Sequence, residues 1–388
     1  MTISTCNDRG SARRTSKAGL FAAVALTFGL GAAGVANADP LGTPAMSASL
    51  SANPNPTKID GGPLGEVYVT GAVSALGFTT SHKVAKDYVD VSNAMVNLQT
   101  TSGPVQFFVE GGAYSFPAAG FPYAKATDTV KNLYGLVPLA YVKIAPTDNF
   151  NIQVGKLPTL IGAEYGYTYQ NINVQRGLLW FQENIVNRGV QANFTQGPVS
   201  LSVSLNDGFY SGKYSWLTGL ATFTLGGGNT LALAAGGNLS DVARTGTATP
   251  LEYNNSEMYN VIFTHASGPW TITPYFQYTH VPTIPSLGIA KGSTTGAALL
   301  VNYKFNDGFS LAGRGEFLNT KGAPAFQYSP GADAVSLTVT PTWQFKTFFI
   351  RGEGAYVHVK NVAPGAAFGA SGNEKNQFRA SIETGMLF

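Results

Sequence analysis

The stretch "VSLSVSLND", residues 199–207, alternates apolar and polar side chains with a period of two. Successive side chains of a β-strand point to opposite faces, so its valines and leucines would share one face and its serines the other. The stretch therefore predicts a strand with one apolar face and one polar face.

The same alternation recurs along most of the chain. In residues 334–344, Val335, Leu337 and Val339 alternate with serine and threonine, and the last residues, "ASIETGMLF", continue the pattern to an aromatic end. We count about 16 such strands, each long enough to cross a bilayer when tilted. They are predicted to begin near these residues: Glu66, Asp90, Pro104, Tyr134, Asn149, Val186, Val199, Tyr214, Thr230, Glu257, Pro269, Thr295, Phe309, Ala334, Phe348 and Asn376.

The connections between these strands alternate in length. Short ones have turn-forming sequences: "SGP" at 102, "PTDN" at 146, "QGP" at 196, "GGGN" at 226, "SGP" at 267 and "NDG" at 306. Long ones lie between them, at residues 115–131, 157–184, 240–256, 281–294, 321–333 and 361–375. Short turns on one rim and long loops on the other are typical of an outer-membrane barrel, in which an even strand number puts both chain ends on the short-turn rim.

The low charge content indicates that the apolar face contacts lipid rather than water. Charged residues make up 12% of the chain, against about 25% in a typical soluble domain. A soluble β-sandwich, solenoid or propeller is the alternative, but a sandwich needs a charged outer face, and no motif repeats here. Closing the sheet in lipid leaves no backbone edge unpaired. The predicted fold is an all-β, transmembrane antiparallel β-barrel over residues 66–388.

The N-terminal residues 1–38 read as a cleaved signal peptide. A basic leader precedes an apolar run at 18–35, and Ala36-Asn37-Ala38 supplies a small-x-small cleavage site. The leader holds four of the 24 Lys and Arg and one of the 21 Asp and Glu, so the exported chain keeps 20 of each. A neutral chain argues against a nucleic-acid partner. Removal of Cys6 leaves no thiol, and residues 39–65 are predicted to form a flexible periplasmic tail.

Aromatic residues gather at the predicted strand ends. Six of them would point outward beside short turns, where Trp and Tyr settle at a membrane interface: Trp270, Tyr303, Phe305, Trp343, Phe345 and Phe388. Each alone could equally be ordinary sheet packing, but the set favours an aromatic girdle.

Across residues 64–388 the chain resembles the OmpL-like β-barrel porin family of Gram-negative outer membranes. The resemblance is carried by residues 154–208, "VGKLPTLIGAEYGYTYQNINVQRGLLWFQENIVNRGVQANFTQGPVSLSVSLNDG", and by the C-terminal strand. It implies a location in the outer-membrane lipid and recognition of Phe388 by the barrel-assembly machinery. By analogy with general porins, a homotrimer is expected.

A barrel of about 16 strands is wide enough for an aqueous channel. The charged residues predicted to face inward are Glu110, Lys143, Lys304, Arg314, Glu316, Lys346, Arg351, Glu353, Arg379 and Glu383. They would line the pore with a transverse field and a slight anion preference, or they would form salt bridges that stiffen the wall. A one-residue shift of register would turn each of them outward.

The longest loop, residues 157–184, is the third on the long-loop side. In general porins the third such loop folds into the lumen, so the resemblance makes it the candidate constriction. Its aromatics would pack on the inner wall and leave Glu164, Arg176 and Glu183 towards water. Alternatively, the loop is exposed and covers the mouth, or its aromatics form a slide for sugars.

Enzymatic motifs are absent from the sequence. The four histidines are scattered, with no HExxH, GxSxG or CxxC pattern, so only His280 and His358 near the outer rim are candidate bases. Neither a metal nor a cofactor is implied. Two functions are therefore weighed: a porin for passive diffusion of small hydrophilic solutes or ions, and a non-channel barrel for adhesion or anchoring. The tail is too short for the plug of an energy-coupled transporter.

Overall fold

The computed structural model describes residues 49–82, 87–244, 249–322 and 327–388. The predicted signal peptide and residues 39–48 of the predicted tail lie outside the described residues. No helix among the described residues is both long and apolar enough to cross a membrane.

The described chain is built almost entirely from strands that run up and down in sequence order. In chain order the elements are β1 (Thr57–Asp60), η2 (Gly62–Leu64), β2 (Glu66–Thr80), β3 (Tyr88–Gln99), β4 (Val105–Tyr114), α1 (Ala126–Asn132), β5 (Leu139–Thr147), β6 (Phe150–Pro158), η3 (Thr168–Gln170), η4 (Trp180–Gln182), β7 (Val186–Gln196), β8 (Val199–Asn206), β9 (Trp216–Gly226), β10 (Asn229–Asn238), α2 (Leu251–Asn254), β11 (Glu257–Ser267), β12 (Trp270–Val281), η5 (Pro285–Leu287), β13 (Gly292–Asn306), β14 (Phe309–Gly322), β15 (Asp333–Phe345), β16 (Phe348–Lys360) and β17 (Asn376–Leu387).

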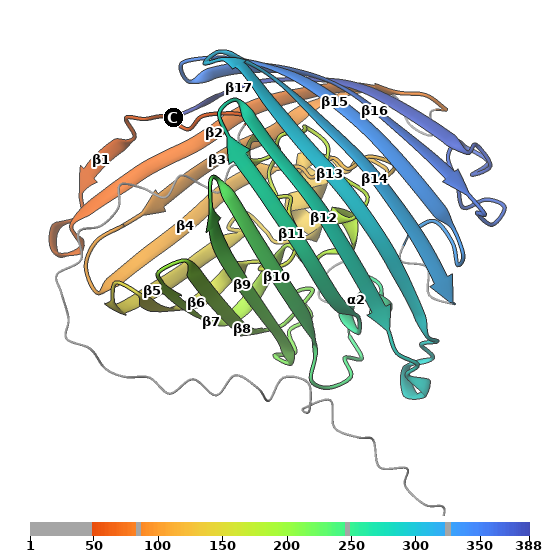
Figure 1. Ribbon diagram of the computed structural model, residues 1–388, viewed down its shortest axis with the longest axis horizontal. Helices are drawn as coiled ribbons and strands as arrows, with labels where there is room; N and C mark the ends of the chain where they lie inside the picture. The colour runs from red at the N-terminus through yellow and green to blue at the C-terminus, as the bar shows by residue number, and fades with distance from the viewer. Residues whose placement is uncertain (1–48, 83–86, 245–248, 323–326) are drawn as a thin grey trace, which may run out of the picture. The chain divides into compact units, whose positions relative to one another are not determined.

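Strands β2 to β17 close into one ring. Each pairs antiparallel with the next, and β17 pairs with β2 from Arg379↔Thr80 to Leu387↔Ala72. The described residues thus form a closed 16-stranded antiparallel barrel (Figure 1). This confirms the predicted fold class, and the predicted starts Glu66, Val186 and Val199 agree with the structure.

The largest error in the predicted starts is at Tyr134, five residues before β5 begins at Leu139. Tyr134 belongs to the connection that carries α1, and its ring is buried in a cluster with Tyr114 and Val186. An aromatic residue packed from a loop has the same local pattern as one in a strand, so alternation alone places the boundary too early.

One strand is additional to the predicted set. Residues 57–60 form β1, which pairs with the beginning of β2 from Thr57↔Val69 to Asp60↔Glu66. β17 covers the rest of the same β2 edge, from Ala72 onward. The Pro-rich composition around β1 gives no strand pattern, so the sequence does not predict this short pairing. The pairing leaves less of β2 as an open edge.

The two faces of the wall are chemically distinct. On β15, burial alternates with period two: Thr338 and Thr340 are 0% exposed on the inner face, whereas Leu337 is 58% exposed on the outer face. Ile382 on β17 is 54% exposed in the same way. An outer surface this apolar needs lipid around it, because water would not solvate it favourably.

Aromatic rings form a chain on the outer face beside the short turns. The centroids of Trp270 and Tyr303 are 4.5 Å apart, those of Tyr303 and Phe305 are 4.7 Å apart, and those of Phe309 and Trp343 are 4.8 Å apart. Phe345 is 73% exposed. The arrangement is that of an interfacial girdle.

The last residue helps to close the barrel. The Phe388 N–H donates to the Gly71 carbonyl at 3.1 Å, and the Gly71 N–H donates to the Phe388 carbonyl at 2.9 Å. A Cβ on Gly71 would lie 2.4 Å from Cζ of the Phe388 ring and 2.3 Å from the Met95 carbonyl oxygen. The closing seam therefore requires glycine at this position.

We expect Gly71→Ala to destabilise the closed barrel by about 1–3 kcal/mol, because the added methyl overpacks the seam. The change lowers the urea concentration at which the barrel unfolds from lipid vesicles. Gly315→Ala is the matched control, since a Cβ there meets nothing within 4 Å. Equal unfolding midpoints for the two variants would contradict this account of the seam.

Candidate functional site

The connection between β6 and β7 lies inside the ring of strands (Figure 1). We call residues 159–185 the inner loop. Almost all of its side chains from 161 to 184 are buried, and only Tyr165 and Phe181 reach 39% and 37% exposure. The buried aromatics Tyr167 and Tyr169 stack at a centroid distance of 6.0 Å. Of the predicted aromatics, Phe181 is the one that stacks on another loop, on Phe121 at 3.5 Å.

Glu353 of β16 binds the centre of the inner loop. Its carboxylate accepts hydrogen bonds from the backbone N–H of Val174 at 2.5 Å and of Gln175 at 2.9 Å. The Gln175 side-chain amide and the Thr340 hydroxyl donate to the same carboxylate at 2.9 and 2.7 Å. A buried carboxylate with four donors holds this part of the loop firmly.

Arg314 of β14 binds a second point of the loop. One Nη donates to Glu164 at 2.6 Å and to the Gln175 carbonyl at 2.7 Å. The same guanidinium pairs with Glu316 on its own strand at 3.2 Å. Glu164 in turn accepts from the Gly177 N–H at 2.9 Å, so this ion pair also fixes the loop backbone.

Arg351 of β16 and Glu383 of β17 form the third anchor. The guanidinium donates to the carbonyl oxygens of Thr168 and Asn171, both at 2.9 Å, and contacts Glu383 at 3.4 Å. The Thr168 hydroxyl donates to Glu383 at 2.5 Å. Wall charge and loop backbone thus share one network.

The structure brings six of the predicted pore-lining residues together around the inner loop. All six are on the inner face, and none is more than 6% exposed: Arg314, Glu316, Arg351, Glu353, Arg379 and Glu383. They bind groups of the inner loop, one another and neutral side chains of neighbouring strands such as Thr338 and Ser336, so we call them the loop-binding wall. A sequence shows the charges of a strand face, but it does not show which distant segment binds them.

The three predicted loop charges differ from the expectation that they face water. Glu164, Arg176 and Glu183 are 7%, 0% and 5% exposed. Burial raises the pKa of Glu164 and lowers the pKa of Arg176 to about 10. The Arg176 guanidinium lies 5.8 Å from the Trp180 ring. Arg314 supplies an opposite charge for Glu164, whereas Glu183 accepts a hydrogen bond from the neutral Tyr275 hydroxyl and faces carboxylates of like charge.

The other predicted charges lie outside this network of arginines and glutamates. Glu110 on β4 is 1% exposed and hydrogen-bonds the inner-loop residue Tyr167, whereas Lys143 on β5 is half-buried. Lys304 is exposed near the end of β13 at the short-turn rim, and Lys346 lies in the turn between β15 and β16. Lys346 has a positive φ of 53°, as expected for a tight turn rather than a strand.

The inner face of β5 to β8 is more open than the loop-binding wall. Lys143 and Gln153 are register partners there, and both are half-buried. Asn193 donates to Asn151 at 2.8 Å and accepts from Ser202 at 2.7 Å, and all three are half-buried.

We call this group of residues the polar wall: Lys143, Asn151, Gln153, Asn193 and Ser202. The neutral members were not among the predicted site residues, although the serines of "VSLSVSLND" indicate this face.

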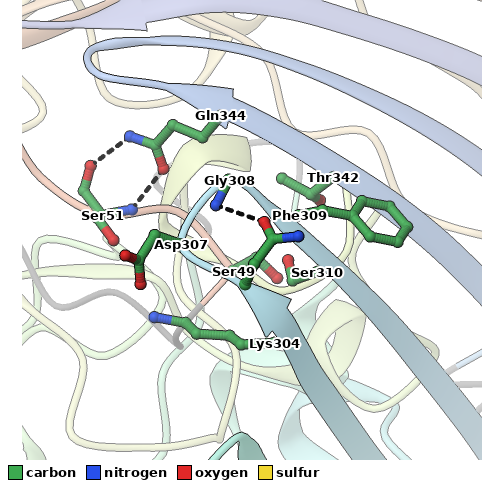
Figure 2. A pocket seen from close by; sticks show the side chains of 10 residues that line it. Ser49, Ser51, Lys304, Asp307, Gly308, Phe309, Ser310, Thr342 and Gln344 are labelled. Atoms are coloured by element: carbon green, nitrogen blue, oxygen red, sulfur yellow. Dashed lines mark hydrogen bonds between the residues drawn. The ribbon is translucent and has the colours of Figure 1, made fainter.

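The beginning of the described chain contacts the short-turn rim, where Ser49 and Ser51 line a pocket with Lys304 and Gln344 (Figure 2). The Ser51 N–H donates to the Gln344 side-chain carbonyl at 2.8 Å, and the Gln344 amide donates to the Ser51 carbonyl at 2.7 Å. The Ser49 hydroxyl reaches the inner-loop carbonyl of Ile172 at 3.2 Å. Leu50 is 4% exposed among buried residues of both wall and loop. Ser49 and Leu50 are therefore buried inside the barrel, and Ser51 is exposed at its rim.

Neither of the two histidines considered as bases forms a hydrogen bond or ion pair with a hydroxyl or thiol nucleophile among the described residues. His280 lies 3.5 Å from Glu257, and His358 contacts the Asn376 side-chain oxygen at 2.7 Å. Within the part of the chain that the structure describes, no group of three His, Cys, Asp or Glu could hold a metal ion.

We expect Glu353→Ala to release the centre of the inner loop. The substitution removes the acceptor of four hydrogen bonds, and a hydrogen bond to a charged group contributes about 1.5–3 kcal/mol, so the loop would open far more often and trypsin would cut after Arg176. Mass spectrometry of the folded barrel measures that cut. Glu66→Ala is the control, because this carboxylate is exposed and paired only at the rim. Equal cleavage of both variants would contradict the role of Glu353 as an anchor of the inner loop.

The inner loop is also expected to loosen as the pH rises. Burial raises the pKa of Glu183 from 4.5 to about 8, against the hydrogen bond that Tyr275 donates to it. A raised carboxyl pKa stabilises the packed state below pH 4.5, and that stability is lost as the pH rises through about 8. The carboxylates of Glu164 and Glu316 add to the effect.

Cleavage after Arg176, normalised to a reference peptide at each pH, should therefore increase from about pH 6 to about pH 9 in the native chain. In Glu183→Gln the amide stays neutral, so the increase should disappear. A pH dependence that survives this substitution would show that another group controls the loop.

Residues 67–388 match the family described as "Putative beta-barrel porin-2, OmpL-like". No curated protein matches the chain in sequence. Solved structures similar to this barrel include an anion-selective porin from Comamonas acidovorans, at a TM-score of 0.57 and 11% identity, with 83% of this chain and 99% of that chain covered.

Two further solved structures have the same fold. The outer-membrane channel DcaP of Acinetobacter baumannii has a TM-score of 0.56 and 13% identity, with 83% of this chain and 97% of that chain covered. The OmpT protein of Vibrio cholerae, described in a trimer form, has a TM-score of 0.55 and 13% identity, with coverages of 83% and 99%. At these identities the likeness concerns the fold. The family match spans the whole barrel, and the chain therefore belongs to the OmpL-like β-barrel porin family.

Proposed function

We propose that the protein is an outer-membrane porin that provides a water-filled path for passive diffusion of small hydrophilic solutes or ions. The polar wall carries this proposal, because its side chains are half-buried while those of the opposite wall are buried against the inner loop. A stretch of wall lined with Asn, Gln, Ser and Lys at partial exposure suits water and polar solutes.

The inner loop is the constriction in this proposal. It contacts β3, β11 and β12 as well as β13 to β17, so in this proposal solutes pass between the loop and the polar wall of β5 to β8. Lys143 is the charged member of the polar wall, whereas the arginines and glutamates of the other wall are engaged with the loop. We therefore expect a slight preference for anions.

Export and assembly follow from the same proposal. Residues 1–38 direct the chain through the inner membrane and are cleaved, and the barrel-assembly machinery recognises the C-terminal strand with Phe388. Outer-membrane lipid then surrounds the apolar face. A homotrimer is proposed by analogy with OmpT of Vibrio cholerae, whose solved form is described as a trimer. No cofactor and no enzymatic step are part of the proposal.

The rival function is a non-channel barrel for adhesion or anchoring. The depth of burial of the inner loop and the burial of Ser49 and Leu50 inside the barrel favour it. Planar-bilayer recording of the refolded protein separates the two functions. Stable conductance steps support the porin, and a folded but silent barrel supports the rival.

We expect Lys143→Glu to lower the anion-to-cation permeability ratio severalfold, since it reverses the charge of the polar wall. Reversal potentials in a salt gradient measure this ratio. Lys131→Glu is the matched control, because it makes the same charge change on an exposed residue of α1, away from the inner wall. The solute path does not follow the polar wall if both variants shift the ratio equally.

A further inference from the structure

A cavity of about 380 Å³ lies among the ends of β2, β3 and β17 and the loops that follow β4 and β16. It is on the long-loop side of the barrel, apart from the polar wall. Six aromatic side chains line it: Phe78, Tyr88, Phe121, Tyr123, Tyr328 and Phe368.

The aromatic rings contact one another in two groups. Phe78 lies 4.7 Å from Tyr123 and 5.5 Å from Tyr88 between centroids. Tyr328 lies 5.7 Å from Phe368 at 86° and 5.9 Å from Phe121 at 20°. The lining therefore contains both edges and faces of aromatic rings. A bound aromatic ring could contact them in the edge-to-face and offset-stacked arrangements that aromatic rings prefer. The cavity thus suits a planar ring better than a chain.

One cation lines the same cavity. Arg379 is 4% exposed, and its guanidinium carbon lies 5.0 Å from the centre of the Phe78 ring. The guanidinium donates hydrogen bonds to the Thr80 hydroxyl at 3.1 Å, to the carbonyl oxygens of Ala118 at 3.1 Å and Phe121 at 2.7 Å, and to the Gln175 side-chain oxygen at 2.9 Å.

All four acceptors of Arg379 are uncharged. A guanidinium has five N–H donors, so one Nη2 hydrogen is left over. No ion pair found among the described residues includes Arg379. Its positive charge is therefore hydrogen-bonded but lacks a contacting anion.

Glu353 interacts electrostatically with Arg379, but its carboxylate is hydrogen-bonded to the inner loop rather than to the guanidinium. The charged groups nearer the cavity also have other partners. Asp90 accepts from the Tyr123 hydroxyl at 2.9 Å and from the Ala126 N–H at 2.8 Å. Glu374 lies 3.8 Å from His82, and both are about half exposed. Lys125 adds a second cation, 5.7 Å from the centre of the Tyr88 ring.

We propose that this cavity binds small aromatic carboxylates, with the ring among the six aromatic side chains and the carboxylate on Arg379. A neutral sugar would leave the guanidinium charge unmatched, and an aliphatic acid would forgo the ring contacts. As a capture site for a transported solute the cavity rests on the proposed porin function, but binding itself does not require a channel.

Binding is tested on the refolded full barrel in lipid nanodiscs by ligand-detected NMR, with benzoate, benzamide and acetate as probes. Benzoate should bind at least about tenfold more tightly than the other two, a difference of about 1.4 kcal/mol. In Arg379→Gln the benzoate affinity should fall to that of benzamide. Lys360→Gln, which removes an exposed cation outside the cavity, should leave benzoate binding unchanged.

Arg379 also contacts the inner loop through Gln175, so a second variant separates binding from folding. Phe78→Leu keeps the guanidinium and removes one ring, and it should weaken benzoate but not acetate. Equal affinities for benzoate and acetate in the native barrel, or a benzoate affinity unchanged by both substitutions, would overturn the site. A barrel that binds benzoate but carries no current would overturn the porin function and support the binding site. A conducting barrel that does not bind benzoate would support the porin function and overturn the binding site.

Discussion

The structure depends on how the backbone of a long loop is satisfied inside a β-barrel. Strands pair their N–H and C=O groups with neighbouring strands, but residues 159–185 do not belong to a strand and lack this regular pairing. Buried backbone groups must nevertheless find partners. Side chains of β14 and β16 provide them: Glu353 accepts from two successive N–H groups, and Arg351 donates to two carbonyl oxygens. The charges on this wall therefore act first as hydrogen-bond partners of the loop.

This arrangement makes the interior of the barrel uneven. The inner loop packs on β2 to β4 and on β11 to β17, and Leu50 and Tyr169 share one buried cluster with residues of β2, β3 and β4. The polar wall of β5 to β8 is only half-buried. Arg379 links the loop residue Gln175 to the aromatic cavity. The position of the loop and the cavity are thus coupled through a few side chains.

Period-two alternation was sufficient to predict the barrel, because each face of a strand has a single solvent. Leu201, Val203 and Leu205 face lipid and Ser202 faces the lumen, as the pattern requires. Alternation also gave the inward direction of Arg314 and Arg351. It could not give their partners, which are about 140 to 180 residues away in sequence. It also missed β1 and the cavity, since both depend on contacts between segments rather than on the pattern within one.

The contrast between Arg351 and Lys143 shows what a charge on a barrel strand means. Both lie on inner faces, and the sequence around each is similarly alternating. Arg351 is 0% exposed with three partners in the loop and wall, whereas Lys143 stands half-buried beside neutral amides. A guanidinium has a planar fork that can bridge several oxygens, and it suits a fixed buried network, while an ammonium on a flexible stem keeps its hydration more readily. On this chain Arg314 and Arg351 hold the inner loop in place, and in the proposed porin it is Lys143 that remains in a position to act on a passing ion.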